Sequence, residues 1–151
     1  MMNIQQACDA FRILLEEQQT RISNMKAEKT DFTTKKVVTI GVIDGDGIGP
    51  IITREATKVL EHLLAEEIAA GSIVIKYIAG LTIENRIACG KAIPDDILAQ
   101  IKTCDVLLKG PTEPPMGGTM ESANVTMRRE LDLYANVRPV CVPEKNIDWM
   151  F

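Results

Sequence analysis

The most informative part of this chain is residues 109–139, which read KGPTEPPMGGTMESANVTMRRELDLYANVRP. This stretch gathers a lysine, a glycine-rich turn, a Ser-x-Asn pair and two well-spaced arginines, Arg128 and Arg138. The arginine guanidinium is a rigid fork of donors that matches a carboxylate in two-point geometry. The combination therefore predicts a receptor for a small polycarboxylate.

A helix that begins near Ser122 would bring several of these polar groups together. Asn124 and Arg128 are four residues apart and would share a helix face. The helix N-terminus would add a partial positive charge and free N–H groups near Ser122. The alternative is that Ser122 only caps the helix and that the arginines pair with Glu130 or Asp132. The spacing alone leaves both interpretations open.

Strand and helix patterns alternate through the body of the chain and predict an α/β fold with a partly parallel sheet. A short β-branched run predicts a buried strand over residues 37–43, and two further strands are expected over residues 72–79 and 105–108. Helices are expected over residues 50–69, 94–103 and 122–131, with a loop or short helix before residue 94 and an extended segment over 136–142. Pro50 would open the first of these helices, and Gly71 would end it.

The first 36 residues form an N-terminal segment with its own pattern. Apolar residues recur at spacings of three and four, which predicts an amphipathic helix; they are Ile4, Ala7, Phe11, Leu14, Leu15, Ile22 and Met25. Asn3 is expected to cap this helix together with Gln6. The apolar face would pack on the body of the protein or on a partner subunit, and the polar run over 29–36 predicts a linker.

The turn at residues 44–50, DGDGIGP, has several possible functions. Its glycine spacing excludes the GxGxxG dinucleotide fingerprint. A calcium loop is disfavoured because Ile48 and Pro50 would occupy ligand positions. Two interpretations remain equally supported. The glycines either let a ligand approach the backbone or serve a tight turn that binds nothing.

The composition excludes several classes of function. A net charge of −4 disfavours a nucleic-acid or anionic-membrane surface, which would need a basic patch. No apolar run approaches the roughly 20 residues that a membrane helix needs, and the acidic N-terminus is unlike a secretory or transit signal. The four cysteines lack metal-site spacing and are expected to be reduced, partly buried thiols. These features together predict a cytoplasmic protein.

Four motifs, in their order and spacing, resemble the isocitrate/isopropylmalate dehydrogenase family. They are DGDGIGP at 44–50, AIPDDIL at 92–98, LLKGP at 107–111 and SANVTMRRELDLYANVRP at 122–139. The resemblance runs from about Val37 to Phe151. It implies an α/β fold that is not a Rossmann fold and that is incomplete in this chain. Residues 1–36 would then be a helical extension, residues 37–134 the N-terminal part of the large domain, and residues 135–151 the start of a small domain.

Members of this family are decarboxylating 2-hydroxy-acid dehydrogenases that use a nicotinamide cofactor and a divalent metal. They form homodimers or higher oligomers whose active sites are shared between subunits. The resemblance implies a set of substrate-binding residues, namely Ser122, Asn124, Arg128, Arg138 and Lys109. It also implies that Ile48 contacts the cofactor.

The serine of the Ser-x-Asn pair bears on the choice of substrate. Members acting on isopropylmalate usually have an apolar residue at this position, whereas the Ser122 hydroxyl can hydrogen-bond a carboxylate. The resemblance therefore favours isocitrate over isopropylmalate, homoisocitrate or tartrate. The implied reaction is the oxidative decarboxylation of isocitrate to 2-oxoglutarate, a step of the tricarboxylic acid cycle, with NAD or NADP and Mg²⁺ or Mn²⁺.

Several positions depart from the family pattern. Asp44 stands where proline is frequent, Ile51 where glutamate is usual, and Pro114 where many members place a threonine on the nicotinamide side. Family members are also much longer. The resemblance places a third arginine, the tyrosine acid, the lysine base, the metal-binding aspartates and the adenosine loop beyond Phe151. No catalytic or metal-binding residue is therefore expected within these 151 residues, which are predicted to be inactive alone. The alternative from another class is a truncated, non-catalytic subunit that docks through residues 4–25.

Overall fold

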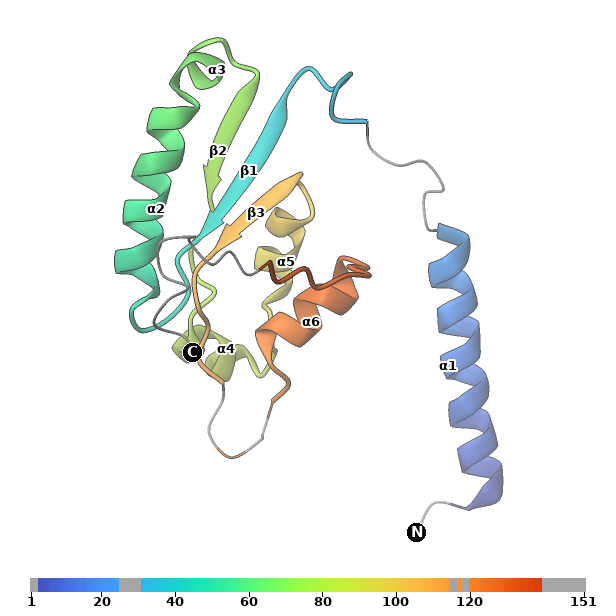
Figure 1. Ribbon diagram of the computed structural model, residues 1–151. Coiled ribbons are helices and arrows are strands. Elements are labelled where there is room, and N and C mark those ends of the chain that lie inside the picture. Colours follow the sequence, from blue (N-terminus) through green and yellow to red (C-terminus); the bar gives the residue numbers. More distant parts are fainter. Residues whose placement is uncertain (1–2, 25–30, 115–116, 118–119, 140–151) are drawn as a thin grey trace, which may run out of the picture. The chain divides into compact units, whose positions relative to one another are not determined.

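A computed structural model describes residues 3–24, 31–114, 117 and 120–139 of the chain. The chain divides into two units, residues 1–35 and 36–151. The first unit contains helix α1 (Ile4–Asn24), and the second contains the sheet and the remaining helices. Figure 1 shows the two units.

Helix α1 begins as its sequence predicts. The Asn3 side-chain oxygen accepts the backbone N–H of Gln6 at 2.8 Å, and the Gln6 side-chain oxygen accepts the N–H of Asn3 at 3.0 Å. This reciprocal pair satisfies two of the N–H groups that a helix start leaves open. The large apolar side chains of the predicted stripe are exposed, namely Ile4, Phe11, Leu14, Leu15 and Ile22. Met25 lies outside the described residues.

The second unit is built on three parallel strands, β1 (Val38–Ile43), β2 (Ile73–Tyr77) and β3 (Val106–Lys109), in the order β2-β1-β3. In the central strand, Ile40 pairs with Ile75 on one side and with Val106 on the other. The predicted α/β fold with a parallel sheet is confirmed.

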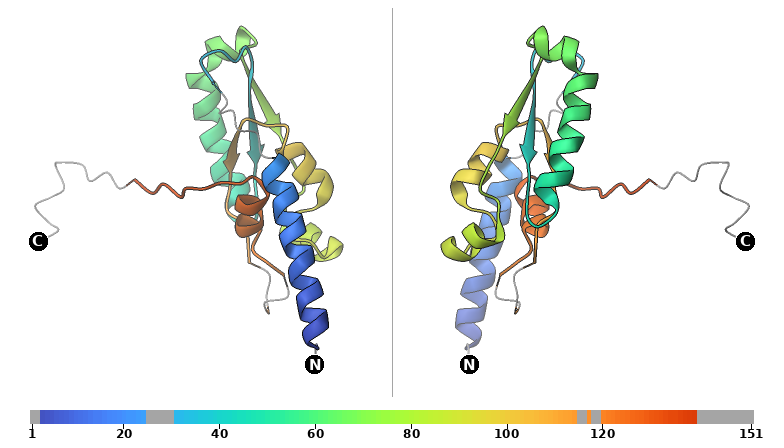
Figure 2. Two further views of the ribbon diagram at one scale, coloured as in Figure 1. Left: turned by 90° about the vertical axis from the view of Figure 1, so that its right-hand side faces the viewer. Right: turned by 90° about the vertical axis from the view of Figure 1, so that its left-hand side faces the viewer.

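Helices cover both faces of this sheet. Helix α2 (Gly49–Leu63) lies on one face, while α5 (Asp95–Ile101) and α6 (Ala123–Glu130) lie on the other (Figure 1, Figure 2). A short helix, α4 (Ile83–Cys89), precedes α5 and is capped by the Thr82 hydroxyl. The core on the α5 and α6 side consists of Ile43, Ile78, Leu81, Ile93, Ile97, Ile101, Ala123 and Met127.

The prediction of a single helix over residues 50–69 was wrong, because two helices occupy this range. Helix α2 ends at Leu63 and α3 spans Ala65–Ala69. Between them Leu64 adopts φ −107° and ψ 20°, outside the helical region. Its N–H still donates to Leu60 O at 3.0 Å, and its carbonyl still accepts the N–H of Ile68 at 2.9 Å. The chain therefore changes direction at Leu64 without leaving backbone groups unpaired.

Two further expectations need correction. Cys8 and Cys89 are exposed, so the expectation of partly buried thiols holds only for Cys104 among the cysteines that the structure describes. The extended segment expected over residues 136–142 is described only as far as residue 139, and that part has no regular structure. No helix within the described ranges is long and apolar enough to cross a bilayer.

Candidate functional site

The sheet topology indicates where a ligand would bind. From β1 the chain crosses to β2 on one side, and it later returns to place β3 on the other side of β1. In open parallel sheets, ligands bind beyond the carboxyl ends of the strands at such a reversal. At these ends β1 continues into the turn 44–50, and β3 continues into the segment 110–114.

Three glycines allow close backbone packing at these ends of the strands. A Cβ on Gly45 would overlap the carbonyl oxygen of Pro111, and a Cβ on Gly110 would overlap that of Asp44. Within the turn itself, a Cβ on Gly49 would also overlap the Asp44 carbonyl oxygen. Close packing therefore explains why glycine stands at these three positions.

Asp46 is a buried carboxylate that ties these loops together. Its Oδ1 accepts the N–H of Ile83 at 2.7 Å, and its Oδ2 accepts the N–H of Glu113 at 2.8 Å. Its own N–H donates to Pro111 O at 2.8 Å. Both carboxylate oxygens are thus engaged, as a buried charge requires.

Arg86, on α4, is fully buried at 0% exposure. Its Nε donates to Ala92 O at 2.9 Å, and its Nη1 donates to Glu113 O at 2.8 Å. Its Nη2 is buried and has no hydrogen-bond partner among the described residues. Sequence reasoning missed both Arg86 and the role of Asp46, since a lone arginine on a short helix carries no spacing signal.

Lys109 ends β3 and is half-buried. Its Nζ donates to Gly110 O at 2.7 Å and lies 3.4 Å from the Thr112 hydroxyl. Burial lowers the pKa of Lys109 below its usual value, the nearby carboxylate of Asp46 opposes this, and the guanidinium of Arg86 adds to it. The predicted lysine therefore lies at the carboxyl end of β3, where its pKa responds to its burial and to the charges of Asp46 and Arg86.

Ile48, the residue predicted to contact a cofactor, belongs to the same region. It is the N-cap residue of α2, and its side chain is 62% exposed. It is an exposed apolar side chain within the turn 44–50.

Two of the predicted substrate residues, Asn124 and Arg128, lie on α6, and Ser122 directly precedes this helix. Ser122 is the N-cap residue, but its side chain makes no capping hydrogen bond. Its backbone carbonyl instead accepts the N–H groups of Val125 and Thr126, each at 3.0 Å. Ser122 and Asn124 are partly buried, and Arg128 is exposed. The interpretation of Ser122 as a side-chain cap is therefore not supported.

The two neighbouring arginines of α6 differ in their contacts. Arg129 Nη1 lies 2.9 Å from Glu121 and its Nε lies 3.8 Å from Glu130, so ion pairing applies to this arginine. No side chain within the described ranges forms a hydrogen bond or ion pair with the Arg128 guanidinium. Arg138 is exposed on the irregular segment that follows α6. In the part of the chain that the structure describes, no hydrogen bond joins Lys109 or Arg138 to the α6 residues.

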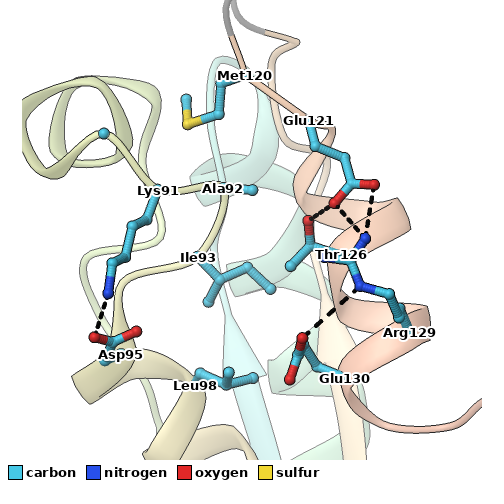
Figure 3. A pocket seen from close by; sticks show the side chains of 11 residues that line it. Lys91, Ala92, Ile93, Asp95, Leu98, Met120, Glu121, Thr126, Arg129 and Glu130 are labelled. Carbon is cyan, nitrogen blue, oxygen red and sulfur yellow. Dashed lines mark hydrogen bonds and ion pairs between the residues drawn. The ribbon is translucent and has the colours of Figure 1, made fainter. Parts of the chain in front are cut away.

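A hollow of about 490 Å³ lies beside α6, which contributes Thr126, Arg129 and Glu130 to its lining (Figure 3). Lys91 and Asp95 pair at 2.5 Å on one wall, and Arg129 pairs with Glu121 on the other. A hydrogen bond from the Thr126 hydroxyl, then the charge of Arg129, lowers the pKa of the Glu121 carboxyl. Because its charged walls compensate one another, this hollow is a poor receptor for a polycarboxylate. The described residues also contain no cluster of three or more His, Cys, Asp or Glu side chains that could hold a metal ion.

Comparison with known proteins adds independent information. Residues 39–148 match the sequence model of the family described as isocitrate/isopropylmalate dehydrogenase. The chain is 39% identical over 120 residues to the isocitrate dehydrogenase (NADP) of Caldococcus noboribetus, covering 74% of this chain and 28% of that protein.

Two other relatives carry different names. The homoisocitrate dehydrogenase of Methanocaldococcus jannaschii is 37% identical over 102 residues, covering 66% of this chain and 27% of that protein. The mitochondrial regulatory subunit 2 of NAD isocitrate dehydrogenase from Arabidopsis thaliana is 33% identical over 98 residues, covering 65% of this chain and 23% of that subunit. The chain spans between 20% and 30% of the length of the curated relatives that it matches.

Proposed function

Because the chain belongs to the isocitrate/isopropylmalate dehydrogenase family, we propose that it is the N-terminal part of an NAD- or NADP-dependent enzyme. The proposed reaction is the oxidative decarboxylation of isocitrate to 2-oxoglutarate. The observation that carries this proposal is the set of polar groups on α6, where Ser122, Asn124 and Arg128 are not engaged with one another or with a cap.

The contrast between Arg128 and Arg129 supports a carboxylate-binding role for Arg128. Two glutamates engage the guanidinium of Arg129. The guanidinium of Arg128 is exposed, and nothing in the described ranges occupies it, so both of its terminal nitrogens can meet a ligand. A two-point contact with a carboxylate is the interaction that this geometry favours. Arg138 is proposed to bind a second carboxylate, as the resemblance implies.

Ser122 supports isocitrate as the substrate. Its hydroxyl is not used by the helix cap and can meet a ligand. A third carboxylate can accept a hydrogen bond from this hydroxyl, whereas an isopropyl group cannot. Homoisocitrate also carries a third carboxylate, so it remains the alternative within the family, together with isopropylmalate and tartrate.

The cofactor is proposed to lie beside the turn 44–50, against Ile48 and near Lys109. A bound nicotinamide supplies the hydride acceptor of the reaction. Ile48 would give the ring an apolar surface, and Lys109 would hold positive charge near the substrate carboxylates. The described residues offer no ligand set for the divalent metal of the family, so its ligands are expected elsewhere. A homo-oligomer remains the proposed assembly.

The exposed apolar face of α1 favours a second candidate, a non-catalytic subunit that binds a partner through this helix. One relative is named a regulatory subunit. The two candidates differ in whether isocitrate is turned over or only bound.

Calorimetric titration of the full-length protein tests the proposed function. Isocitrate and isopropylmalate are titrated separately, with the Arg128→Ala variant as the matched control. The proposal predicts binding of isocitrate at least about tenfold tighter than of isopropylmalate, and weaker isocitrate binding by Arg128→Ala. Equal affinities for the two acids, or binding unaffected by Arg128→Ala, would contradict it.

A further inference from the structure

The peptide groups of Glu113 are held from both sides by two buried, oppositely charged side chains. The Glu113 N–H donates to Asp46 Oδ2 at 2.8 Å, and the Glu113 carbonyl accepts from Arg86 Nη1 at 2.8 Å. Asp46 is 6% exposed and Arg86 is 0% exposed. Hydrogen bonds to charged, buried partners are stronger than those between neutral groups. Both the backbone N–H and the backbone carbonyl of Glu113 are therefore fixed by charged side chains.

The other hydrogen bonds of the same two side chains connect Glu113 to α4 and to the loop that follows it. Asp46 Oδ1 accepts the N–H of Ile83, the first residue of α4, at 2.7 Å. Arg86 Nε donates to Ala92 O, in the loop after α4, at 2.9 Å. Three parts of the chain that are distant in sequence thus meet through one carboxylate and one guanidinium.

Packing alone does not account for an arginine at position 86. Its Nη2 is buried without a partner among the described residues, and such a donor is costly. An apolar side chain of similar size would fill the same space without that cost. The fork of the guanidinium, by contrast, reaches Ala92 O and Glu113 O at once.

We propose that Arg86 is a positioning residue which, together with Asp46, holds the segment 110–114 and thereby sets the place and the charge environment of Lys109. A role of Lys109 in substrate or cofactor binding rests on the proposed function. The role of Arg86 and Asp46 in holding the segment 110–114 is independent of the proposed function.

The charges of the two side chains support this assignment. The guanidinium of Arg86 lowers the pKa of Lys109, and the carboxylate of Asp46 raises it. Removal of the positive charge at position 86 should therefore raise the pKa of Lys109. A replacement that keeps the charge but loses the fork should release Glu113 and reduce the burial of Lys109, which is the main cause of its lowered pKa.

Two variants in the full chain separate these effects. Arg86→Lys keeps the charge and loses the two-point geometry, whereas Arg86→Met keeps the length and loses both. Arg54→Lys is the matched control, because Arg54 is exposed on α2 and pairs only with its neighbour Glu55 among the described residues.

The first measurement is amide hydrogen exchange followed by NMR. In both Arg86 variants the Glu113 amide should exchange at least tenfold faster than in the parent protein, relative to the β1 amide of Val42. The Arg54→Lys control should show no such change. The proposal is overturned if the Glu113 and Val42 amides accelerate by the same factor, or if Glu113 does not accelerate.

The second measurement is the NMR titration of the Lys109 side chain. The pKa should rise in Arg86→Lys, which keeps the charge but releases the segment that buries Lys109, and rise further in Arg86→Met. An Arg86 that acts on Lys109 only through its charge would leave the pKa unchanged in Arg86→Lys, and this result would overturn the proposal.

A third variant covers the case in which Arg86→Met does not fold. In Asp46→Asn only one side-chain oxygen remains to accept a hydrogen bond, whereas two N–H groups, those of Ile83 and Glu113, each need an acceptor. One of these two N–H groups must therefore lose its partner. Acceleration of one of these two amides is the expected result, and protection of both would overturn the proposal. None of these measurements requires a substrate, so they remain informative if isocitrate does not bind.

Discussion

Replacement of Arg128 by alanine in the full-length protein should weaken the use of isocitrate without disturbing the fold. The side chain is exposed, and no described residue pairs with it. Its removal therefore breaks no hydrogen bond or ion pair among the described residues, and the loss falls on the ligand. A charge-assisted hydrogen bond contributes about 1.5–3 kcal/mol, and about 1.4 kcal/mol corresponds to a tenfold change in rate or affinity. KM should rise, and kcat/KM should fall by about tenfold to 150-fold.

The assay is steady-state formation of NADH or NADPH over a range of isocitrate concentrations. Arg129→Ala is the control, because Arg129 is engaged by Glu121 and Glu130 rather than available to a ligand. Exposed ion pairs contribute about 0–1 kcal/mol, so this variant should differ from the parent protein by less than about fivefold. Unchanged kinetics in Arg128→Ala would refute the assignment of this arginine to a substrate carboxylate.

Three other predictions test separate parts of the account. Ser122→Leu should lower kcat/KM for isocitrate relative to isopropylmalate by at least about tenfold, and an unchanged ratio would remove Ser122 from substrate selection. Gly110→Ala should lower the free energy of unfolding by about 1–3 kcal/mol, because its Cβ would overlap Asp44 O and the Thr53 hydroxyl; unaltered urea denaturation would show that the loops can separate freely. The pKa of Lys109 is lowered from 10.5 in the folded state, mainly by burial. The unfolded state therefore binds more protons than the folded state between the lowered pKa and 10.5, and stability rises with pH across that window. Urea unfolding at about pH 8 and about pH 10 should show this rise in the parent protein and a smaller one in Lys109→Met, whereas equal slopes would mean that the Lys109 pKa is not shifted.

Local patterns predicted much of the fold. The three strands were predicted to within two residues at either end, and the Asn3–Gln6 pair predicted the start of α1. The break at Leu64 was missed because a change in two backbone dihedral angles leaves the spacing of apolar residues intact. The short helix α4 was left open between loop and helix, since its seven residues are too few for a clear period.

The residues of the candidate site were also only partly predicted from the sequence. The sequence predicted the helix that carries Asn124 and Arg128 and its start near Ser122. Asp46 forms hydrogen bonds with Ile83 and Glu113, which lie 37 and 67 positions further along the chain. Arg86 forms one with Glu113, 27 positions away. Contacts of this kind depend on the assembled sheet and leave no periodic signal. The binding roles of the predicted residues, the boundary near residue 135 and the choice between NAD and NADP remain predictions.

The most direct test of the central claim is turnover by the purified full-length protein. Isocitrate, homoisocitrate, isopropylmalate and tartrate are each supplied with Mg²⁺ and with NAD or NADP, and reduced cofactor and 2-oxo acid are measured together. The account predicts reduced cofactor and 2-oxoglutarate in equal amounts, with isocitrate preferred over the other three acids. Preference for another acid, or binding of isocitrate without any turnover, would contradict it.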